Sequence, residues 1–243
     1  MNIKEAVDIT QRAQRNYDLS KPIKEEDLET LIYAAKESPT KQNETHYHIK
    51  VYTDDTIVKL YRTTKEFVMW DGTEKDLKEV FDDSDPNKLK SKRDNAVYNS
   101  QVFGRALFVY FLDEGNLRSG HHAVSKLEGA SQKSKDKLLE QQRYSIGISV
   151  GQMILSAALL GYRTGLCTAF GKKLVKEICN TKLKPMIMVG VGYPKDGVNR
   201  RISMETLNKE VPERFRNGKD EELWMFPSFE KHNTVTLNDK EYK

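Results

Sequence analysis

The strongest constraint on the fold of this chain is segment 145–170, SIGISVGQMILSAALLGYRTGLCTAF, in which an apolar helix runs through a glycine into a short strand. From Ile146 to Leu160 the apolar residues surround the helix, which predicts a helix buried on every side. Its glycines, serines and alanines predict that another helix packs very close to it. A membrane span needs about 20 apolar residues, whereas this run is shorter and contains Gln152 and several serines. The segment is therefore predicted to be the central helix of a soluble core.

The rest of the chain alternates between helical and extended patterns. Helices are predicted at 3–15, 25–36, 56–67 and 172–180, and strands at 48–52, 106–112, 165–170 and 186–192. Gly161 is placed to end the central helix in a left-handed conformation. This order predicts an α+β fold with a mixed, mostly antiparallel sheet flanked by helices.

The length of the chain, 243 residues, and the absence of a linker-like stretch predict one domain over 1–243. Two polar segments, 71–95 and 115–143, are predicted to be excursions from it, the second becoming helical toward its end. Segment 212–243 is polar with isolated aromatic residues, and such a segment cannot form a core alone. It is predicted to be an arm that lies over the body or over a partner subunit.

Charge and cysteine usage exclude several classes of function. The net charge is only +4 and the two signs are interspersed, so the basic stripe expected of a nucleic-acid binder is missing. The first residues include acids and no apolar stretch, which predicts neither a signal peptide nor a membrane anchor, and hence a cytoplasmic protein. Cys167 and Cys179 lack metal-ligand spacing and are predicted to be buried thiols. The five histidines form no recognisable metal set, so no metal site is predicted.

The common nucleotide, zinc-protease and serine-hydrolase motifs are absent from the sequence. A set of separated polar elements remains: Arg12 and Arg15, the run SPTKQN at 38–43, Asn99, the strand that contains Leu166, and Arg200 with Arg201. In order and spacing these elements resemble the nitroreductase family of FMN-dependent oxidoreductases, over about residues 3 to 207. The resemblance implies a nitroreductase-like fold and FMN as the cofactor.

In that family an early Arg-x-Ser-x-Arg-like segment binds the flavin phosphate and the pyrimidine edge. Here the segment reads QRAQR at 11–15, so the first Arg and the Ser are absent. The resemblance implies that Arg12, Ala13 and Arg15 bind the cofactor. A guanidinium group suits a phosphate because it offers forked donors. From the residues alone, a solvated helix end remains the alternative.

The family's next element is a Ser-Pro-Ser-x-x-Asn-x-Gln-Pro-Trp loop, which corresponds to 38–47. The resemblance implies that Pro39, Thr40 and Asn43 contact the isoalloxazine ring and that Lys41 also belongs to the cofactor-binding residues. The Gln-Pro-Trp half is replaced by THY at 45–47. From the residues alone, Ser-Pro-Thr could simply stop the preceding helix.

Three further positions follow from the resemblance. Asn99 stands where the family places an Asn near the flavin, although a lone Asn can also be a helix cap or turn residue. Arg200 and Arg201 stand where the family carries basic residues that close on the phosphate. Adjacent side chains of an extended chain point to opposite sides, so only one of the two can reach the phosphate. The alignment favours Arg201.

The strand after the central helix occupies the place of the family's Pro-x-Glu-Gly-like segment, which implies cofactor contacts from Leu166, Thr168 and Ala169. The backbone amide near Thr168 or Ala169 would face flavin N5. No catalytic side chain is implied, because the hydride chemistry belongs to the cofactor and the protein orients it.

As a whole the resemblance implies a homodimer in which two central helices pack together and FMN binds at each of two interface sites. NAD(P)H would reduce FMN and leave, and a nitroaromatic or quinone acceptor would then take its place in a ping-pong cycle. The preference between NADH and NADPH stays open. Two alternatives also stay open: a different flavin task, such as dehalogenation, heterocycle oxidation or flavin cleavage, and a flavin-binding or storage protein with little turnover.

Overall fold

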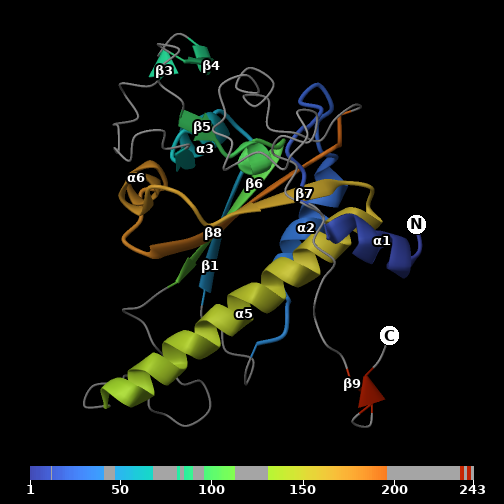
Figure 1. Ribbon diagram of the computed structural model, residues 1–243, viewed down its shortest axis with the longest axis vertical. Helices are drawn as coiled ribbons and strands as arrows, with labels where there is room; N and C mark the ends of the chain where they lie inside the picture. The colour runs from blue at the N-terminus through green and yellow to red at the C-terminus, as the bar shows by residue number, and fades with distance from the viewer. Residues whose placement is uncertain are drawn as a thin grey trace. The chain divides into compact units, whose positions relative to one another are not determined.

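The computed structural model describes residues 1–11, 13–40, 47–67, 81–82, 85–89, 96–112 and 131–195, with short backbone stretches at 236–237 and 240–241 (Figure 1). The chain divides into two units, Met1–Arg201 and Ile202–Lys243. In the second unit the described residues form one antiparallel pair, β9 (Thr236–Leu237) with β10 (Lys240–Glu241). The predictions of one domain and of a C-terminal arm at 212–243 remain predictions.

The first unit is built on a four-stranded antiparallel sheet, which confirms the predicted α+β class. Its strand order is β1 (Tyr47–Tyr52), β6 (Ala106–Leu112), β8 (Lys184–Gly192) and β7 (Arg163–Cys167). All seven residues of β6 are buried, as its continuous apolar run predicts. Two small pairs lie outside this sheet: β2 (Lys65–Phe67) with β5 (Ala96–Tyr98), and β3 (Phe81–Asp82) with β4 (Asp85–Leu89).

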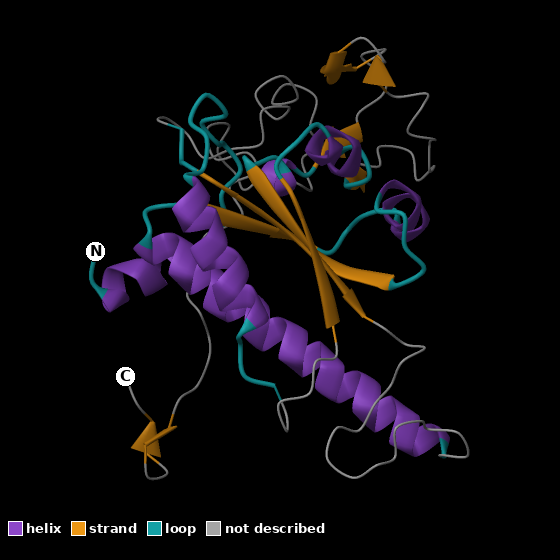
Figure 2. Ribbon diagram, turned by 180° about the vertical axis from the view of Figure 1, so that it is seen from behind, coloured by secondary structure: helices purple, strands orange, loops and turns teal. Residues whose placement is uncertain are grey.

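Helices cover both faces of the sheet (Figure 2). Alternate residues of a strand point to opposite faces, so Phe108 and Tyr110 of β6 pack with α2 (Glu25–Lys36) and α5 (Gln132–Leu159). Val109 and Phe111 pack on the other face with α3 (Thr56–Tyr61) and α6 (Lys172–Ile178). The first helix, α1 (Ile3–Thr10), packs on α5. None of the helices in the described ranges is long and apolar enough to cross a membrane.

The central helix α5 is confirmed, but its burial differs from the prediction. Ile146, Val150 and Met153 are buried against the sheet, whereas Tyr144, Ile148 and Leu159 are 60%, 47% and 45% exposed. A methyl group added at Gly147 or Gly151 would meet no atom within 4 Å. The prediction of burial on every side is therefore wrong for a single protomer. Gly161 has φ +90°, which confirms the left-handed helix end.

Other boundaries shift where tertiary contacts compete with the local pattern. The helix predicted at 3–15 ends at Thr10, because the next residues extend along β7: the Gln14 N–H donates to the Thr164 carbonyl at 2.8 Å. The helix predicted at 56–67 ends at Tyr61. There each threonine hydroxyl donates to the carbonyl three residues earlier: Thr63 to Leu60 at 2.7 Å and Thr64 to Tyr61 at 2.6 Å.

The later elements agree more closely with their predictions. The strand predicted at 165–170 runs from Arg163 to Cys167, so Thr168 and Ala169 follow it rather than belong to it. The helix predicted at 172–180 ends at Ile178, and the strand predicted at 186–192 begins at Lys184. The predictions for 25–36 and 106–112 are confirmed at both ends.

Candidate functional site

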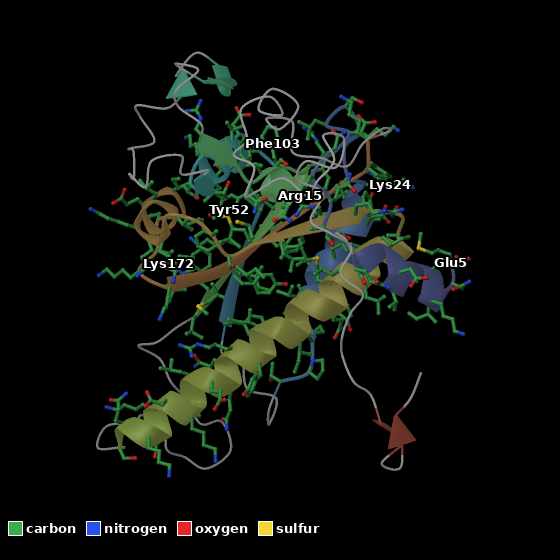
Figure 3. All side chains as sticks on the ribbon, in the orientation of Figure 1. Glu5, Arg15, Lys24, Tyr52, Phe103 and Lys172 are labelled. Atoms are coloured by element: carbon green, nitrogen blue, oxygen red, sulfur yellow. The ribbon has the colours of Figure 1, made fainter. Side chains whose placement is uncertain are left out.

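The candidate site lies along the outer edge of β7, the last strand of the sheet. Inward-facing groups of β7 pair with β8, while the Thr164 and Leu166 carbonyls point outward and need donors. The Gln14 N–H donates to Thr164. The side-chain amide of Gln101 lies 2.6 Å from the Leu166 oxygen. The edge is therefore covered by two segments, 13–17 and the short helix η2 (Ser100–Val102), and Arg15 lies beside β7 (Figure 3).

The neighbours of Gln101 determine how its amide is oriented. A guanidinium can only donate a hydrogen bond and a backbone carbonyl can only accept one. The amide oxygen therefore faces Arg15 Nη2 at 2.9 Å, and the amide nitrogen faces the Leu166 oxygen at 2.6 Å and Asn99 Oδ1 at 2.9 Å. The opposite orientation would allow one bond, from Asn99 Nδ2 at 2.7 Å. It would also set donor against donor at Arg15 and acceptor against acceptor at Leu166, whereas the first orientation has one conflict, between the amide nitrogen and Asn99 Nδ2 at 2.7 Å. The first orientation is therefore favoured.

The backbone of Gln101 is held directly on the sheet by a pair of glycines. Gly165 of β7 and Gly190 of β8 are paired across the strands. A methyl group added at either would lie only 2.5 or 2.4 Å from the Gln101 carbonyl oxygen, so only glycine allows this close approach. The buried Tyr17 hydroxyl donates to the same oxygen at 2.9 Å. Burial raises the pKa of Tyr17 well above its usual value, so this hydroxyl keeps its proton.

Arg15 brings a permanent positive charge to this edge. It is half-buried, and burial lowers its pKa from the usual value. Arginine remains protonated at neutral pH even so, because its ordinary pKa is above 12. Arg15 Nη1 also approaches the Ala13 carbonyl at 3.4 Å. The site therefore offers a fixed cation next to the end of an edge strand.

Asn99 and Cys167 complete the buried side of the site. Asn99 Oδ1 accepts from the Gln101 backbone N–H at 3.1 Å, so Asn99 is an N-cap as well as a neighbour of the Gln101 amide. The Cys167 thiol donates to the Ala169 carbonyl at 3.1 Å, and burial raises its pKa. A neutral, inward-directed thiol is a poor nucleophile. Both cysteines are buried, as the sequence predicts.

The structure brings together only part of the predicted site. Arg15, Ala13, Asn99 and Leu166 lie in one cluster, and the exposed Thr168 and Ala169 follow directly after β7. In the part of the chain described, no hydrogen bond joins Pro39 or Thr40 to this cluster. Five predicted residues lie outside the described residues: Arg12, Lys41, Asn43, Arg200 and Arg201.

Sequence reasoning missed Gln101 and Tyr17. Gln101 acts through its side-chain amide on a backbone carbonyl, and Tyr17 acts through its hydroxyl on two backbone carbonyls, those of Gln101 and Gly190. No motif spacing marks such contacts. The two paired glycines, 25 positions apart in the sequence, were the available signal that another backbone approaches the sheet closely.

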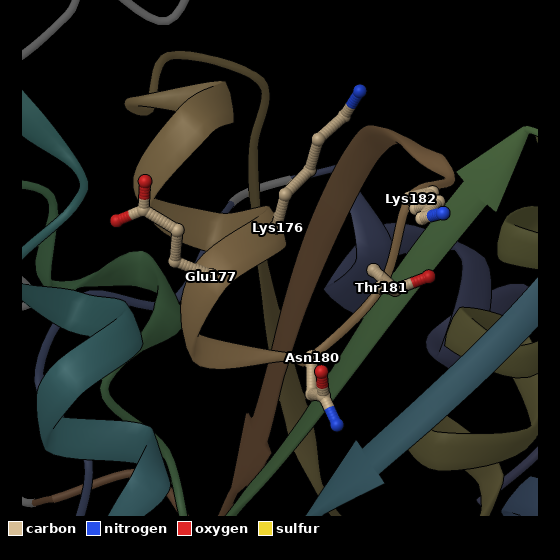
Figure 4. A pocket seen from close by; sticks show the side chains of 5 residues that line it. All are labelled: Lys176, Glu177, Asn180, Thr181 and Lys182. Atoms are coloured by element: carbon tan, nitrogen blue, oxygen red, sulfur yellow. The ribbon is translucent and has the colours of Figure 1, made fainter.

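Two hollows lie outside the cluster. An apolar groove of about 450 Å³ runs between α5 and the sheet; it is lined by Arg143, Ile146, Gly147, Val150, Gly151, Ile154, Leu166, Met186 and Ile187. A polar hollow of about 390 Å³ lies at the end of α6 (Figure 4); it is lined by Lys176, Glu177, Asn180, Thr181 and Lys182. The groove shares Leu166 with the cluster, whereas the polar hollow shares no residue with it.

Comparisons with known proteins agree with this architecture. The model of the nitroreductase family matches residues 10–193. Nitroreductase A from Vibrio parahaemolyticus is similar at 16% identity and a TM-score of 0.54, over 81% of this chain and 70% of that one. A nitroreductase family protein from Clostridium novyi NT is similar at 17% identity and a TM-score of 0.53, over 81% and 87% of the two chains.

A third structure, from Staphylococcus epidermidis, is provisionally named an NAD(P)H:FMN oxidoreductase. It is similar at 14% identity and a TM-score of 0.52, over 81% of this chain and 91% of that one. No curated protein matches the chain. At these identities the solved structures show the fold.

Proposed function

This chain belongs to the nitroreductase family of flavin oxidoreductases, and we propose that it uses FMN to transfer electrons from NAD(P)H to an electron-poor acceptor, such as a nitroaromatic or a quinone, in a ping-pong cycle. The observation that carries the proposal is the cluster at the outer edge of β7. There Arg15, Asn99 and Leu166, all candidates on sequence grounds, are joined through one amide. The provisional name of the Staphylococcus epidermidis structure gives the same cofactor and electron donor.

The donors at this edge fit FMN in their chemistry. The cofactor carries a phosphate and a ring edge rich in acceptors, and Arg15 offers forked donors with a permanent charge. Ala13 has no side chain that would compete for this space. Arg12 and one of the pair Arg200 and Arg201, by the alignment Arg201, are proposed to supply further phosphate contacts. Pro39, Thr40 and Asn43 are proposed to contact the ring, and Lys41 to bind the cofactor beside them.

In this proposal the bound FMN supplies the hydride chemistry, and the protein orients it. Thr168 and Ala169 follow directly after the end of β7 and are exposed there. The backbone amide of one of them is proposed to donate toward N5. Cys167 donates inward to Ala169, and no role in the reaction is proposed for its thiol.

We also propose that the protein is a homodimer in which α5 packs against its copy. The exposed side of α5 carries Ile148 and Leu159 next to the uncovered Gly147 and Gly151. Small residues of this kind allow two helices to approach closely. A dimer would also let Pro39 and Thr40, which make no hydrogen bond to the cluster within the described residues, reach the flavin site of the partner subunit.

The test of the cofactor and the donor is spectroscopic. Purified protein, as isolated or after reconstitution with FMN, should be yellow, and anaerobic NADH or NADPH should bleach it. A quinone or a nitroaromatic should then restore the colour, and double-reciprocal plots should be parallel. Protein that stays colourless after incubation with FMN contradicts the proposal. Yellow protein that neither nicotinamide bleaches supports a storage role, and reoxidation by a halotyrosine but not a quinone supports a different flavin task.

A further inference from the structure

We propose that Gln101 is a positioning residue of this site, whose side-chain amide fixes the Arg15 guanidinium against the outer edge of β7 without reducing its charge. The inference rests on the proposed function, because it concerns a positive charge beside bound flavin. It adds a residue to the site that does not itself contact the cofactor.

The side-chain amide of Gln101 is bonded at both its oxygen and its nitrogen. Its oxygen accepts from Arg15, and its nitrogen donates to the Leu166 carbonyl and to Asn99 Oδ1. The side chain therefore joins the end of segment 13–17 to the edge of β7. Without it, the Leu166 carbonyl would lose this donor and the Arg15 guanidinium would lose its bond to the amide oxygen.

Gln101 has little freedom to move. The residue is only 8% exposed. Its carbonyl rests on the Gly165–Gly190 pair and accepts from the Tyr17 hydroxyl, and its N–H donates to Asn99. Because the backbone is held on three sides, the amide sits at a fixed place and can hold the guanidinium in one orientation. Supporting contacts of this kind keep a binding group in its productive geometry.

The Gln101 side chain is neutral, and this matters for the charge of the site. A carboxylate at the same place would also accept from Arg15, but its negative charge would offset the positive charge that the cofactor meets. It would also lack the N–H that the Leu166 carbonyl needs. Glutamine satisfies both neighbours and leaves the cation intact. A positive charge near the ring stabilises the flavin more when it is reduced and anionic, so the amide should help to keep the reduction potential high.

The test compares Gln101→Glu and Gln101→Met, which keep the length of the side chain, with Gln142→Met as the control. Gln142 is a buried glutamine of α5 and does not belong to the cluster. Both Gln101 variants should raise the dissociation constant of FMN by about tenfold, as expected for the loss of an interaction that orients a charged hydrogen bond. Gln101→Glu should also make the midpoint potential of bound FMN more negative than Gln101→Met does. A merely structural role would affect the two variants alike.

A second measurement on cofactor-free protein separates this inference from the proposed function. The guanidinium of Arg15 can be followed by ¹⁵N-arginine NMR, with its signals assigned by their loss in Arg15→Lys. The signals should show restricted rotation of the guanidinium in the wild type and rotational averaging in Gln101→Met. An unchanged Arg15 signal overturns the inference whether or not FMN binds. Equal affinity and equal potential in all variants that bind FMN also overturn it. A changed Arg15 signal in a protein that takes up no FMN supports the positioning role and rejects the flavin function.

Discussion

Arg15 and Arg163 show how two half-buried arginines can differ in role. Burial lowers the pKa of both. Arg15 is held by the amide of Gln101 at the outer edge of β7, while Arg163 donates to the carbonyl of Tyr162, its own neighbour in the sequence, at 3.1 Å. The first arrangement presents a cation at the proposed flavin site, and the second is local to the start of the strand.

We therefore expect Arg15→Ala to weaken FMN binding and Arg163→Ala to leave it nearly unchanged. A hydrogen bond to a charged group contributes about 1.5–3 kcal/mol, which corresponds to about tenfold to a hundredfold in the dissociation constant. Quenching of flavin fluorescence during titration measures this constant. Equal losses in the two variants would mean that Arg15 acts through general stability and not through the cofactor.

At this scale the sequence predicts the residues that a known motif contains and misses those that act through backbone atoms. Arg15, Asn99 and Leu166 follow from the order of the family's elements, and the structure places them in one cluster. Gln101 is not predicted, because it binds the backbone carbonyl of Leu166 and every residue type has such a carbonyl. Its value depends on a tertiary contact between β7 and η2, and no local pattern records that contact.

At the scale of elements, agreement depends on whether the local pattern meets a competitor. The helix at 25–36 and the strand at 106–112 are predicted correctly at both ends. The helix packs one apolar side against the core, and the strand is buried on both of its faces, so the apolar pattern of each ends where the element ends. The first helix is shorter than its pattern predicts, since pairing with the Thr164 carbonyl extends the chain from residue 13 onward. Helical periodicity alone cannot anticipate a sheet edge that forms from residues about 150 positions away.

The glycine pair under η2 gives a prediction about stability. Gly190→Ala should destabilise the protein by at least about 1–3 kcal/mol, the usual cost of overpacking a core, because its methyl group would lie 2.4 Å from the Gln101 carbonyl oxygen. Urea unfolding measures the change. Gly171→Ala is the control, since its methyl group would make only ordinary contacts with Leu174, and it should cost less than about 1 kcal/mol. Similar losses in both variants would argue against close packing of η2.

The uncovered glycines of α5 give a prediction about assembly. Gly151→Leu should leave the protomer folded, because a methyl group there meets no atom within 4 Å and leucine is a much better helix former than glycine. It should shift the protein from dimer to monomer in sedimentation velocity, since the side chain would separate the two helices. Lys137→Leu changes an exposed residue of the same helix outside the groove and should remain dimeric. A dimeric Gly151→Leu protein would place the interface elsewhere.

For the whole molecule, the buried thiols and phenols predict how stability depends on pH. Burial raises the pKa of Cys167, Cys179 and Tyr17, so the folded state binds these protons more tightly than the unfolded state does. The contribution is fully present below the unfolded pKa values, about 8.5 for Cys and about 10 for Tyr. It is lost as pH rises toward the folded pKa values.

The free energy of unfolding should therefore fall as pH rises above about 8.5. Urea unfolding at a series of pH values from neutral to alkaline measures this. In the double variant Cys167→Ala, Cys179→Ala the fall should begin only near the tyrosine range, about pH 10. A free energy of unfolding that stays level across the alkaline range in the parent protein would contradict the burial of these groups.

The two segments that cover the outer edge of β7 should also hinder aggregation of the protein by strand addition. A bare edge strand is a template on which another chain can add a strand and start an aggregate. Here the outward carbonyls of Thr164 and Leu166 are already taken by Gln14 and Gln101. The contacts that cover the proposed flavin site therefore also occupy these two carbonyls, so that another strand cannot easily pair with them. Loss of the Gln101 amide should accordingly increase turbidity on mild heating, before the protein as a whole unfolds.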